Sequence, residues 1–264
     1  MDLHYRSYGA GPPLVILHGL FGSLDNWATL ARRWSDQFHV WAFDARNHGR
    51  SFHDERMDYP SMADDLGRFM TRHGMTSAHL LGHSMGGKTA MQFAATLPGR
   101  VQRLIVVDVA PRAYRRRHDR ILDALLSLDP RRFANRKEAD DALGKFIDEA
   151  PTRQFLLKNL AREDAGGLRW KMNLEAISRH YDALRGAVTE GIQCDRPALF
   201  VRGGRSSYIG EQDRAIIKAR FPRAVLMTVR NAGHWVHADA QDDLYQIVRK
   251  FLLQLILIFG HMQQ

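Results

Sequence analysis

The motif Gly82-His83-Ser84-Met85-Gly86 constrains the fold of this chain more than any other feature of its sequence. It satisfies the pattern G-x-S-x-G; the apolar run AHLL precedes it and the amphipathic run KTAMQFAATL follows it. This context predicts a strand, a sharp turn and a helix, and the small residues beside the serine leave room for the turn. The turn would expose the Ser84 hydroxyl near a helix N-terminus, whose dipole favours developing negative charge. We therefore predict a nucleophilic serine on a strand-to-helix elbow.

Short apolar runs alternate with longer amphipathic stretches along most of the chain, which is typical of an α/β fold. Several of the apolar runs are rich in Val, Ile and Leu without polar alternation, as expected of parallel strands covered on both faces. The predicted strands are Leu14–Leu17, Val40–Phe43, His79–Leu81, Leu104–Val107, Ala198–Val201 and Val225–Val229, with Leu3–Tyr8 as an added edge strand. The predicted helices are Asp25–Trp34, Ser61–Arg72, Gly86–Thr96 and Tyr245–Leu253. We expect a mostly parallel central sheet flanked by helices.

The alternation stops after Pro111. Residues 112 to about 190 predict one helix after another and no strand. In an alternating fold such a block is an insertion, and its usual position is over the active site. We therefore expect residues 1–111 and 191–264 to form the core, and residues 112–190 to form a helical cap.

A base and an acid must accompany the serine, because its hydroxyl is a poor nucleophile at neutral pH. In proteins with this elbow, the serine comes first along the chain, the acid second and the histidine last. His234 follows the last predicted strand, in a glycine-containing loop, and is the predicted base. His237 is the competing candidate. Asp108 ends a predicted strand, at the sheet edge where ligands bind in open parallel sheets. Asp213 is the alternative acid, since Ser206 stands where the aspartate falls in the commonest arrangement. We expect Asp108 to orient His234, with Ser206 as an auxiliary hydrogen-bond partner.

An acyl-transfer site also needs hydrogen-bond donors for the oxyanion. The backbone N–H of Met85, directly after the nucleophile, is the first predicted donor. The glycine-containing loop after the strand at 14–17 would supply the second, from Leu20 or, as second choice, Phe21; we expect His18 in that loop to be structural. The candidate substrate contacts are Phe21, His83, Trp170 and Trp235.

The chain is basic, with a net charge of +9. Five arginines cluster at the start of the predicted cap, namely Arg112, Arg115, Arg116, Arg117 and Arg120. They could attract a carboxylate or phosphate of a substrate, although charge runs are more often solvated helix faces. No nucleic-acid-binding signature accompanies the basicity, so we do not expect nucleic-acid binding.

Three further features bear on compartment and partners. The single cysteine, Cys194, excludes an internal disulfide and any CxxC site. No secretory signal is visible in the first residues, so we expect a cytoplasmic location. The apolar run at 251–259 would reach roughly 14 Å as a helix, well short of the ~30 Å hydrocarbon core of a bilayer. We expect no membrane span; the run would serve packing or an interface, or come from a shift of reading frame.

Taken together, these segments resemble the α/β-hydrolase fold family over nearly the whole chain. The resemblance rests on HG at 18–19, DARNHGRS at 44–51, GHSMGG at 82–87 and AGHWVHAD at 232–239. Within the family the chain is similar to YbfF-type bacterial esterases, through HGLFGS at 18–23, DVAP at 108–111, WKMNL at 170–174 and RGGRSSYI at 202–209. In that subgroup the aspartate in the position of Asp108 belongs to the triad, and a serine in the position of Ser206 completes the set.

The resemblance implies hydrolysis of small carboxylic esters, or of acyl thioesters such as acyl-CoA. The site residues predict acyl transfer in two steps through Ser84, with no metal or organic cofactor. Arginines in the cap would suit a phosphate-bearing leaving group. The same fold also carries C–C bond hydrolases, cofactor-free haloperoxidases and non-catalytic binding proteins, and these remain the alternatives.

Overall fold

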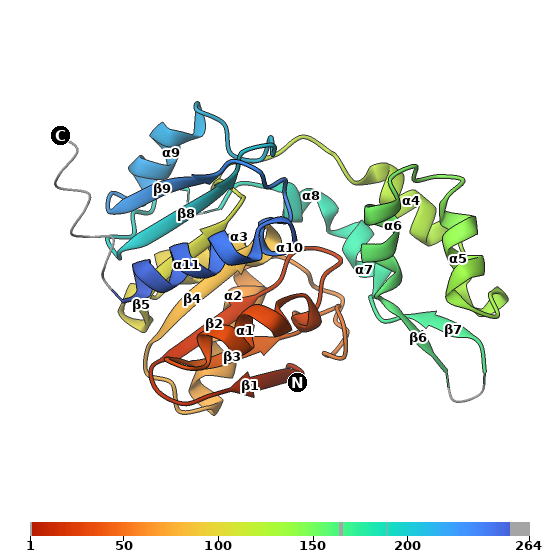
Figure 1. Ribbon diagram of the computed structural model, residues 1–264, viewed down its shortest axis with the longest axis horizontal. Helices are drawn as coiled ribbons and strands as arrows, with labels where there is room; N and C mark the ends of the chain where they lie inside the picture. Colours follow the sequence, from red (N-terminus) through yellow and green to blue (C-terminus); the bar gives the residue numbers. More distant parts are fainter. Residues whose placement is uncertain (1, 164–165, 189, 254–264) are drawn as a thin grey trace.

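The computed structural model describes residues 2–163, 166–188 and 190–253. A seven-stranded sheet crosses it in the order β1-β3-β2-β4-β5-β8-β9 (Figure 1). Strand β1 pairs antiparallel with β3, and every other pairing in this sheet is parallel. The strands are β1 (Tyr5–Tyr8), β2 (Pro13–Leu17), β3 (His39–Phe43), β4 (Ala78–His83), β5 (Val101–Val107), β8 (Ala198–Gly203) and β9 (Ala224–Val229). The predicted fold class, a mostly parallel sheet with an N-terminal edge strand, is confirmed.

Helices cover both faces of this sheet (Figure 1). Helices α1 (Ala28–Trp34) and α11 (Gln241–Leu252) pack on one face. Helices α2 (Tyr59–Arg72), α3 (Met85–Thr96) and α9 (Asp213–Arg220) pack on the other. Successive side chains of a strand point to opposite faces of the sheet. In β2, Leu14 and Ile16 therefore belong to the apolar cluster on the side of α1 and α11, whereas Val15 and Leu17 belong to the cluster on the side of α2, α3 and α9. Burial on both faces explains why the strand sequences show no polar alternation.

Several helices begin earlier than predicted, and local capping explains one case. Helix α2 begins at Tyr59, because the Asp58 side chain accepts the N–H of Ser61 at 2.7 Å and Pro60 fits the first helical turn. The helix predicted to begin at Asp25 is split into a 3₁₀ turn and α1, and α11 begins at Gln241 after the short helix α10 (Val236–Asp239). The 3₁₀ segments are Leu24–Trp27, Pro98–Arg100 and Pro130–Arg132.

The segment between β5 and β8 lies to one side of the sheet (Figure 1). We call the described residues of 112–188 the cap. Its helices are α4 (Asp119–Ser127), α5 (Arg136–Leu143), α6 (Ala150–Leu157), α7 (Leu174–Arg179) and α8 (Tyr181–Arg185). The prediction that this segment has no strand is wrong, because β6 (Leu160–Arg162) and β7 (Leu168–Trp170) form an antiparallel pair. Each strand has three residues, which is too short for an alternating pattern to be visible in the sequence.

The C-terminal apolar run is described only at its start. Helix α11 ends at Leu252, and residues 254–264, which hold most of the run predicted at 251–259, lie outside the described residues. Within the described ranges, none of the helices has both the length and the apolar character needed to cross a bilayer.

Candidate active site

The predicted elbow is present at Ser84, between the central strand β4 and helix α3. Ser84 has φ 51° and ψ −117°, a region that non-glycine residues rarely occupy and that costs about 1–3 kcal/mol. The flanking glycines make this turn possible. A Cβ on Gly82 would lie 2.2 Å from the Gly86 carbonyl oxygen, and a Cβ on Gly86 would lie 2.3 Å from that of Leu17. Only glycine fits at these two positions, so the serine is held above the carboxyl end of β4.

Ser84, His234 and Asp108 form a continuous hydrogen-bonded series. The Ser84 Oγ lies 3.1 Å from His234 Nε2, and His234 Nδ1 lies 2.8 Å from Asp108 Oδ2. Asp108 is fully buried and also accepts the N–H of Gly203 at 2.9 Å and the hydroxyl of Ser206. The carboxylate accepts the proton on Nδ1, so Nε2 of the neutral imidazole is free to take the serine proton. The arrangement can activate Ser84 as a nucleophile.

The two competing residues lie elsewhere. Asp213, the alternative acid, is buried and pairs with Arg112 at 2.6 Å. The ring of His237 stacks on Trp27 with their centroids 4.6 Å apart. Neither side chain therefore makes the contact that a triad acid or base requires.

Two aromatic side chains hold His234 in place. His83 Nε2 lies 2.9 Å from the backbone carbonyl oxygen of His234, and burial lowers the pKa of His83 well below its usual value. The neutral His83 ring therefore donates to that carbonyl. On the other side, the Tyr208 ring stacks on the His234 imidazole, with centroids 3.7 Å apart and an angle of 14° between the planes. His83, which the sequence predicted as a substrate contact, thus contacts the backbone of His234, the predicted base.

The loop that follows β2 lies against the elbow. A Cβ on Gly19 would lie 3.2 Å from Ser84 Cβ, so the next peptide groups adjoin the nucleophile. The N–H of Phe21 donates to His48 Nε2 at 3.2 Å and is therefore occupied. The N–H groups of Leu20 and Met85 have no acceptor within the described ranges. This difference favours Leu20 and Met85, the pair predicted from the sequence, as oxyanion donors.

Two buried histidines fix this loop against the loop that follows β3. Each ring donates from Nδ1 to a backbone carbonyl and accepts at Nε2: His18 accepts the N–H of Ala45 at 2.9 Å, and His48 accepts that of Phe21. Burial lowers the pKa of His18 to about 4 and that of His48 to about 3. Both rings are therefore neutral at pH 7, as an acceptor nitrogen requires. This is the structural role expected for His18.

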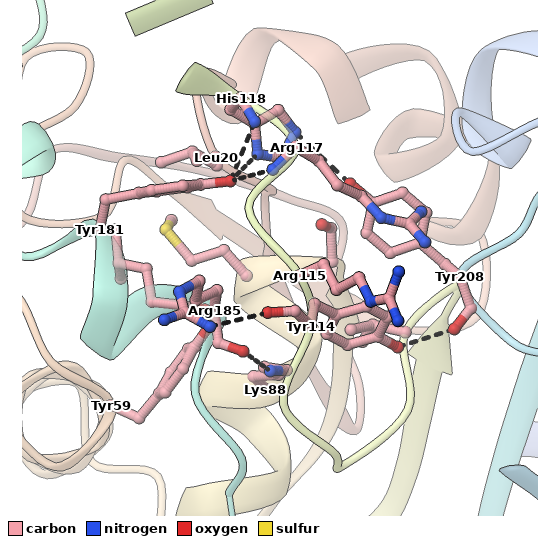
Figure 2. Close-up of a pocket in the computed structure, with 14 residues that line it drawn as sticks. Leu20, Tyr59, Lys88, Tyr114, Arg115, Arg117, His118, Tyr181, Arg185 and Tyr208 are labelled. Atoms are coloured by element: carbon pink, nitrogen blue, oxygen red, sulfur yellow. Dashed lines mark hydrogen bonds between the residues drawn. The ribbon is translucent and has the colours of Figure 1, made fainter.

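Two cavities meet at the nucleophile, and Leu20, Ser84 and His118 line both. The first, which we call the tyrosine cavity, is shown in Figure 2. Its aromatic residues are Tyr59, Tyr114, Tyr181 and Tyr208. The second, which we call the Trp235 cavity, is lined by Phe21, His83, Phe155, His234 and Trp235 among others. Three of the four predicted substrate contacts thus lie in the Trp235 cavity, whereas Trp170 lies in β7 and lines neither of these two cavities.

The arginines of the basic cluster have separate surroundings. Arg112 pairs with Asp213, Arg116 pairs with Asp119 and Asp182 at 2.8 Å each, and Arg120 lies 3.5 Å from Asp148. Arg115 and Arg117 line the tyrosine cavity, and Arg117 donates to the Ser207 hydroxyl at 3.0 Å. The cluster is therefore divided between acid-paired residues and two that adjoin the site.

Lys88 ties the cap to the elbow helix, a role that the sequence analysis missed. Its side chain is buried at 2% exposure, and burial with the nearby Arg112 charge lowers its pKa to about 7. The Nζ donates to the carbonyl oxygens of Arg112 at 2.9 Å and Gly186, and to that of Arg185 at 3.3 Å, the bond drawn in Figure 2. Both ends of the cap therefore meet at one ammonium group. Its place four residues after Ser84 puts it on the same helix face, but no sequence signal shows what it binds.

Comparisons with known proteins agree with this geometry. A family model described as the alpha/beta hydrolase fold matches residues 12–241. The chain is 37% identical to Esterase YbfF of Escherichia coli, over 91% of this chain and 92% of that protein. It is 40% identical to the sn-1-specific diacylglycerol lipase ABHD11 of Xenopus laevis, over 96% of this chain and 84% of that protein.

A solved structure gives the same result for the fold. The structure titled "Marine microorganism esterase" superposes with a TM-score of 0.93 at 43% identity, and the match covers 95% of this chain and 99% of that one. The resemblance inferred from the sequence motifs is confirmed. With a family model over residues 12–241 and relatives that match 91% and 95% of its length, this chain belongs to the α/β-hydrolase fold family.

Proposed function

We propose that the chain is a carboxylesterase that cleaves small esters through an acyl-enzyme on Ser84. The observation that carries the proposal is the hydrogen-bonded series from Ser84 Oγ to His234 and on to the buried Asp108. Relatives named esterase and lipase, at 36–40% identity, support the same class of reaction. A hydroxyl, an imidazole and a carboxylate in this order are what acyl transfer requires.

In the first step Ser84 Oγ attacks the ester carbonyl carbon while His234 Nε2 takes the hydroxyl proton. The negative charge that forms on the carbonyl oxygen is stabilised by the N–H groups of Leu20 and Met85. The C–O bond then breaks, and His234 returns the proton to the departing alcohol. Water repeats the sequence on the acyl-enzyme and releases the acid. Asp108 holds the ring and stabilises the imidazolium throughout.

The two cavities divide the substrate between them. His234 must reach the leaving oxygen to protonate it, and His234 lines the Trp235 cavity. The alcohol part would therefore occupy the Trp235 cavity. The acyl part would occupy the tyrosine cavity, which extends from Ser84 and Met85 towards Lys88 and the ends of the cap.

An acyl thioester is the second candidate substrate. The same nucleophile, base and oxyanion donors serve a thioester, whose thiol leaves with the His234 proton. The observation that favours it is the position of Arg115 and Arg117 beside the tyrosine cavity, where a phosphate-bearing group would meet two cations. For this substrate the two parts would be reversed: the phosphate-bearing thiol part would lie in the tyrosine cavity, where Tyr208 stacks on His234, and the acyl part would lie in the Trp235 cavity.

The test is hydrolysis of p-nitrophenyl esters with acyl chains of two to sixteen carbons, measured beside Ser84→Ala. We expect a burst followed by turnover in the wild type and neither in the variant, with the same thermal unfolding of both. The chain-length optimum would then define the acyl pocket. Folded wild-type protein without turnover on any ester would contradict the proposal and favour a C–C hydrolase or a binding protein.

A further inference from the structure

Three side chains form a hydrogen-bonded series across the boundary between cap and core. Tyr181 and His118 belong to the cap, and Tyr208 belongs to the loop that follows β8. The Tyr181 hydroxyl lies 2.8 Å from His118 Nδ1, and His118 Nε2 lies 3.4 Å from the Tyr208 hydroxyl (Figure 2). All three side chains line the tyrosine cavity, and the mechanism proposed above uses none of these polar groups.

Two backbone groups set the direction of every proton in this series. The Tyr181 hydroxyl oxygen accepts the N–H of Arg117 at 3.2 Å and the N–H of His118 at 3.0 Å. With both lone pairs engaged, its own proton is left to donate to His118 Nδ1. Burial, with the nearby His234, lowers the pKa of His118 to about 4, so the ring is neutral at pH 7. A neutral ring that accepts at Nδ1 carries its proton on Nε2.

The series therefore ends in two donors that face the site. The separation of 3.4 Å between His118 Nε2 and the Tyr208 oxygen is at the long limit for a hydrogen bond, so an oxygen atom placed beside them can receive the N–H. Burial raises the pKa of Tyr208 to about 12, so its hydroxyl keeps its proton and is the second donor. The Arg117 guanidinium lies 5.0 Å from the centre of the Tyr208 ring. Its charge lowers the pKa of both donors: burial outweighs it at Tyr208, and at His118 it acts in the same direction as burial. No acceptor for the Tyr208 proton lies within the described ranges.

The position of these donors relates them to the acyl group. Tyr208 stacks on His234, and His118 lines both cavities together with Ser84. Both donors therefore line the cavity assigned to the acyl part, and His118 lies with Ser84 where the two cavities meet. A purely aliphatic acyl chain would bury them without a partner, which carries a desolvation cost. A site built to donate hydrogen bonds discriminates against substrates that lack the matching acceptor.

We propose that His118 and Tyr208 are specificity-determining residues that donate hydrogen bonds to an oxygen atom on the acyl chain. The preferred substrate class is an ester whose acyl group carries an ether, oxo or hydroxyl oxygen close to the carbonyl carbon. This inference rests on the proposed function, because it assumes that Ser84 is acylated.

A matched pair of esters tests it, namely 4-nitrophenyl methoxyacetate and 4-nitrophenyl butyrate. The two acyl groups have the same number of chain atoms and differ by an oxygen in place of one methylene. The methoxyacetate is intrinsically more reactive, so the quantity to compare is the ratio of the two kcat/KM values in each variant. The intrinsic difference cancels when the variant's ratio is divided by that of the wild type.

We expect Tyr208→Phe to lower the methoxyacetate-to-butyrate ratio about threefold to tenfold, the value of one neutral hydrogen bond. Tyr181→Phe should lower it as well, although its hydroxyl touches no substrate, because His118 then loses the donor that fixes its proton on Nε2. Tyr59→Phe is the control: Tyr59 lines the same cavity, but its hydroxyl donates to the Leu184 carbonyl, so the ratio should stay unchanged.

Each other outcome would overturn the inference. An unchanged ratio in Tyr208→Phe, with butyrate turnover retained, removes the donor role while leaving the proposed function standing. Equal losses on both esters mean that Tyr208 acts only by orienting His234. Absence of Ser84-dependent turnover on either ester removes the proposed function and this inference with it. Thermal unfolding of each variant shows whether a loss of activity comes from a destabilised fold. If one of Tyr208→Phe and Tyr181→Phe is destabilised, the ester ratio of the other, stable variant decides.

Discussion

The core and the cap hold their side chains in different ways. In the core, the residues proposed to act on the ester are held by buried hydrogen bonds, such as those that Asp108 accepts from Gly203 and Ser206. In the cap, many charged side chains form exposed pairs, as Arg116 does with Asp182. Exposed pairs contribute about 0–1 kcal/mol each, whereas leaving a buried polar group unpaired costs about 1–3 kcal/mol. The groups proposed to react are thus the more strongly held ones.

The substrate-facing donors, by contrast, come partly from the cap. His118 and Tyr181 reach the site from there, and both ends of the cap are joined to the elbow helix through Lys88. We infer that the core sets the rate of the chemistry and that the cap selects the acyl group. Substitutions in the core should therefore lower turnover on every ester, and substitutions in the cap should change which ester is preferred.

The largest effect is expected from Asp108→Asn. The amide can donate to His234 Nδ1, so the imidazole would adopt the tautomer with its proton on Nε2 and could no longer accept the serine proton. We expect kcat to fall about 10⁴-fold on all esters, as for other amidated triad aspartates. Steady-state kinetics on the p-nitrophenyl esters would measure it.

Two control variants accompany that measurement. Ser206→Ala removes one donor to the Asp108 carboxylate and leaves the carboxylate itself, so its loss should be far smaller. Asp213→Asn should keep near-full turnover, because Asp213 pairs with Arg112. Near-full activity in Asp108→Asn together with an inactive Asp213→Asn would reverse the assignment of the acid.

The parts of the core that could be predicted share a physical basis. The strands are long apolar runs, and the carboxyl ends of parallel strands meet at one edge of a sheet. Residues that directly follow those strands, such as Ser84 and Asp108, must therefore lie near one another. The chain order of nucleophile, acid and base then leaves few histidines, and the loop after β9 supplies His234.

The parts that could not be predicted depend on contacts between cap and core. His118 and Tyr208 are 90 residues apart. The arginine run beside His118 resembles a solvated helix face, and the segment RGGRSSYI indicates Ser206 and not Tyr208. Lys88 is an unremarkable helix residue in sequence, and its partners are backbone carbonyls, which leave no trace in residue types. The β6–β7 pair is too short to show a period. Packing between segments, not local pattern, determines these features.

A second core variant would displace an oxyanion donor without touching the triad. His48→Leu removes the acceptor of the Phe21 N–H and so frees the loop that carries Leu20. Loss of one oxyanion donor costs about 10²- to 10³-fold in kcat, and we expect a loss near 10²-fold here. His48→Gln, which keeps an acceptor and a donor, is the matched control and should retain more activity. Equal activity in both variants would show that the histidine does not position the loop.

The joint between cap and core is tested by Lys88→Met. The methionine fills similar space but leaves the carbonyls of Arg112, Arg185 and Gly186 without their shared donor. Because hydrogen bonds to charged groups contribute about 1.5–3 kcal/mol, we expect kcat/KM to fall about tenfold, mainly through KM. Hydrogen exchange at two amides near this joint should become faster: that of Tyr114, which donates to Arg185 at the other end of the cap, and that of Val188, which donates to Pro111 of the core.

Lys137→Met is the control for the Lys88 variant, because Lys137 is an exposed lysine of the cap that pairs with Asp141. It should change neither kcat/KM nor the exchange of those two amides. Unchanged exchange in Lys88→Met would mean that the cap is held in place by its other contacts, and the division into a rigid core and a joined cap would need to be redrawn.

The smallest effect is expected from the arginines of the cap, and it should differ between those beside the tyrosine cavity and those paired with acids. Arg115→Gln with Arg117→Gln removes the two cations beside the tyrosine cavity, and we expect KM for an acyl-CoA to rise more than KM for a neutral ester. Arg116→Gln is the matched control, since Arg116 is paired with Asp119 and Asp182 and should leave both constants within about twofold, as exposed ion pairs contribute little. If the double variant raises both KM values equally, the arginines contribute to the shape of the cavity and not to recognition of an anion, and the thioester loses the observation that favours it. If only the acyl-CoA value rises, selection by the cap extends from the acyl chain to the charge of the substrate.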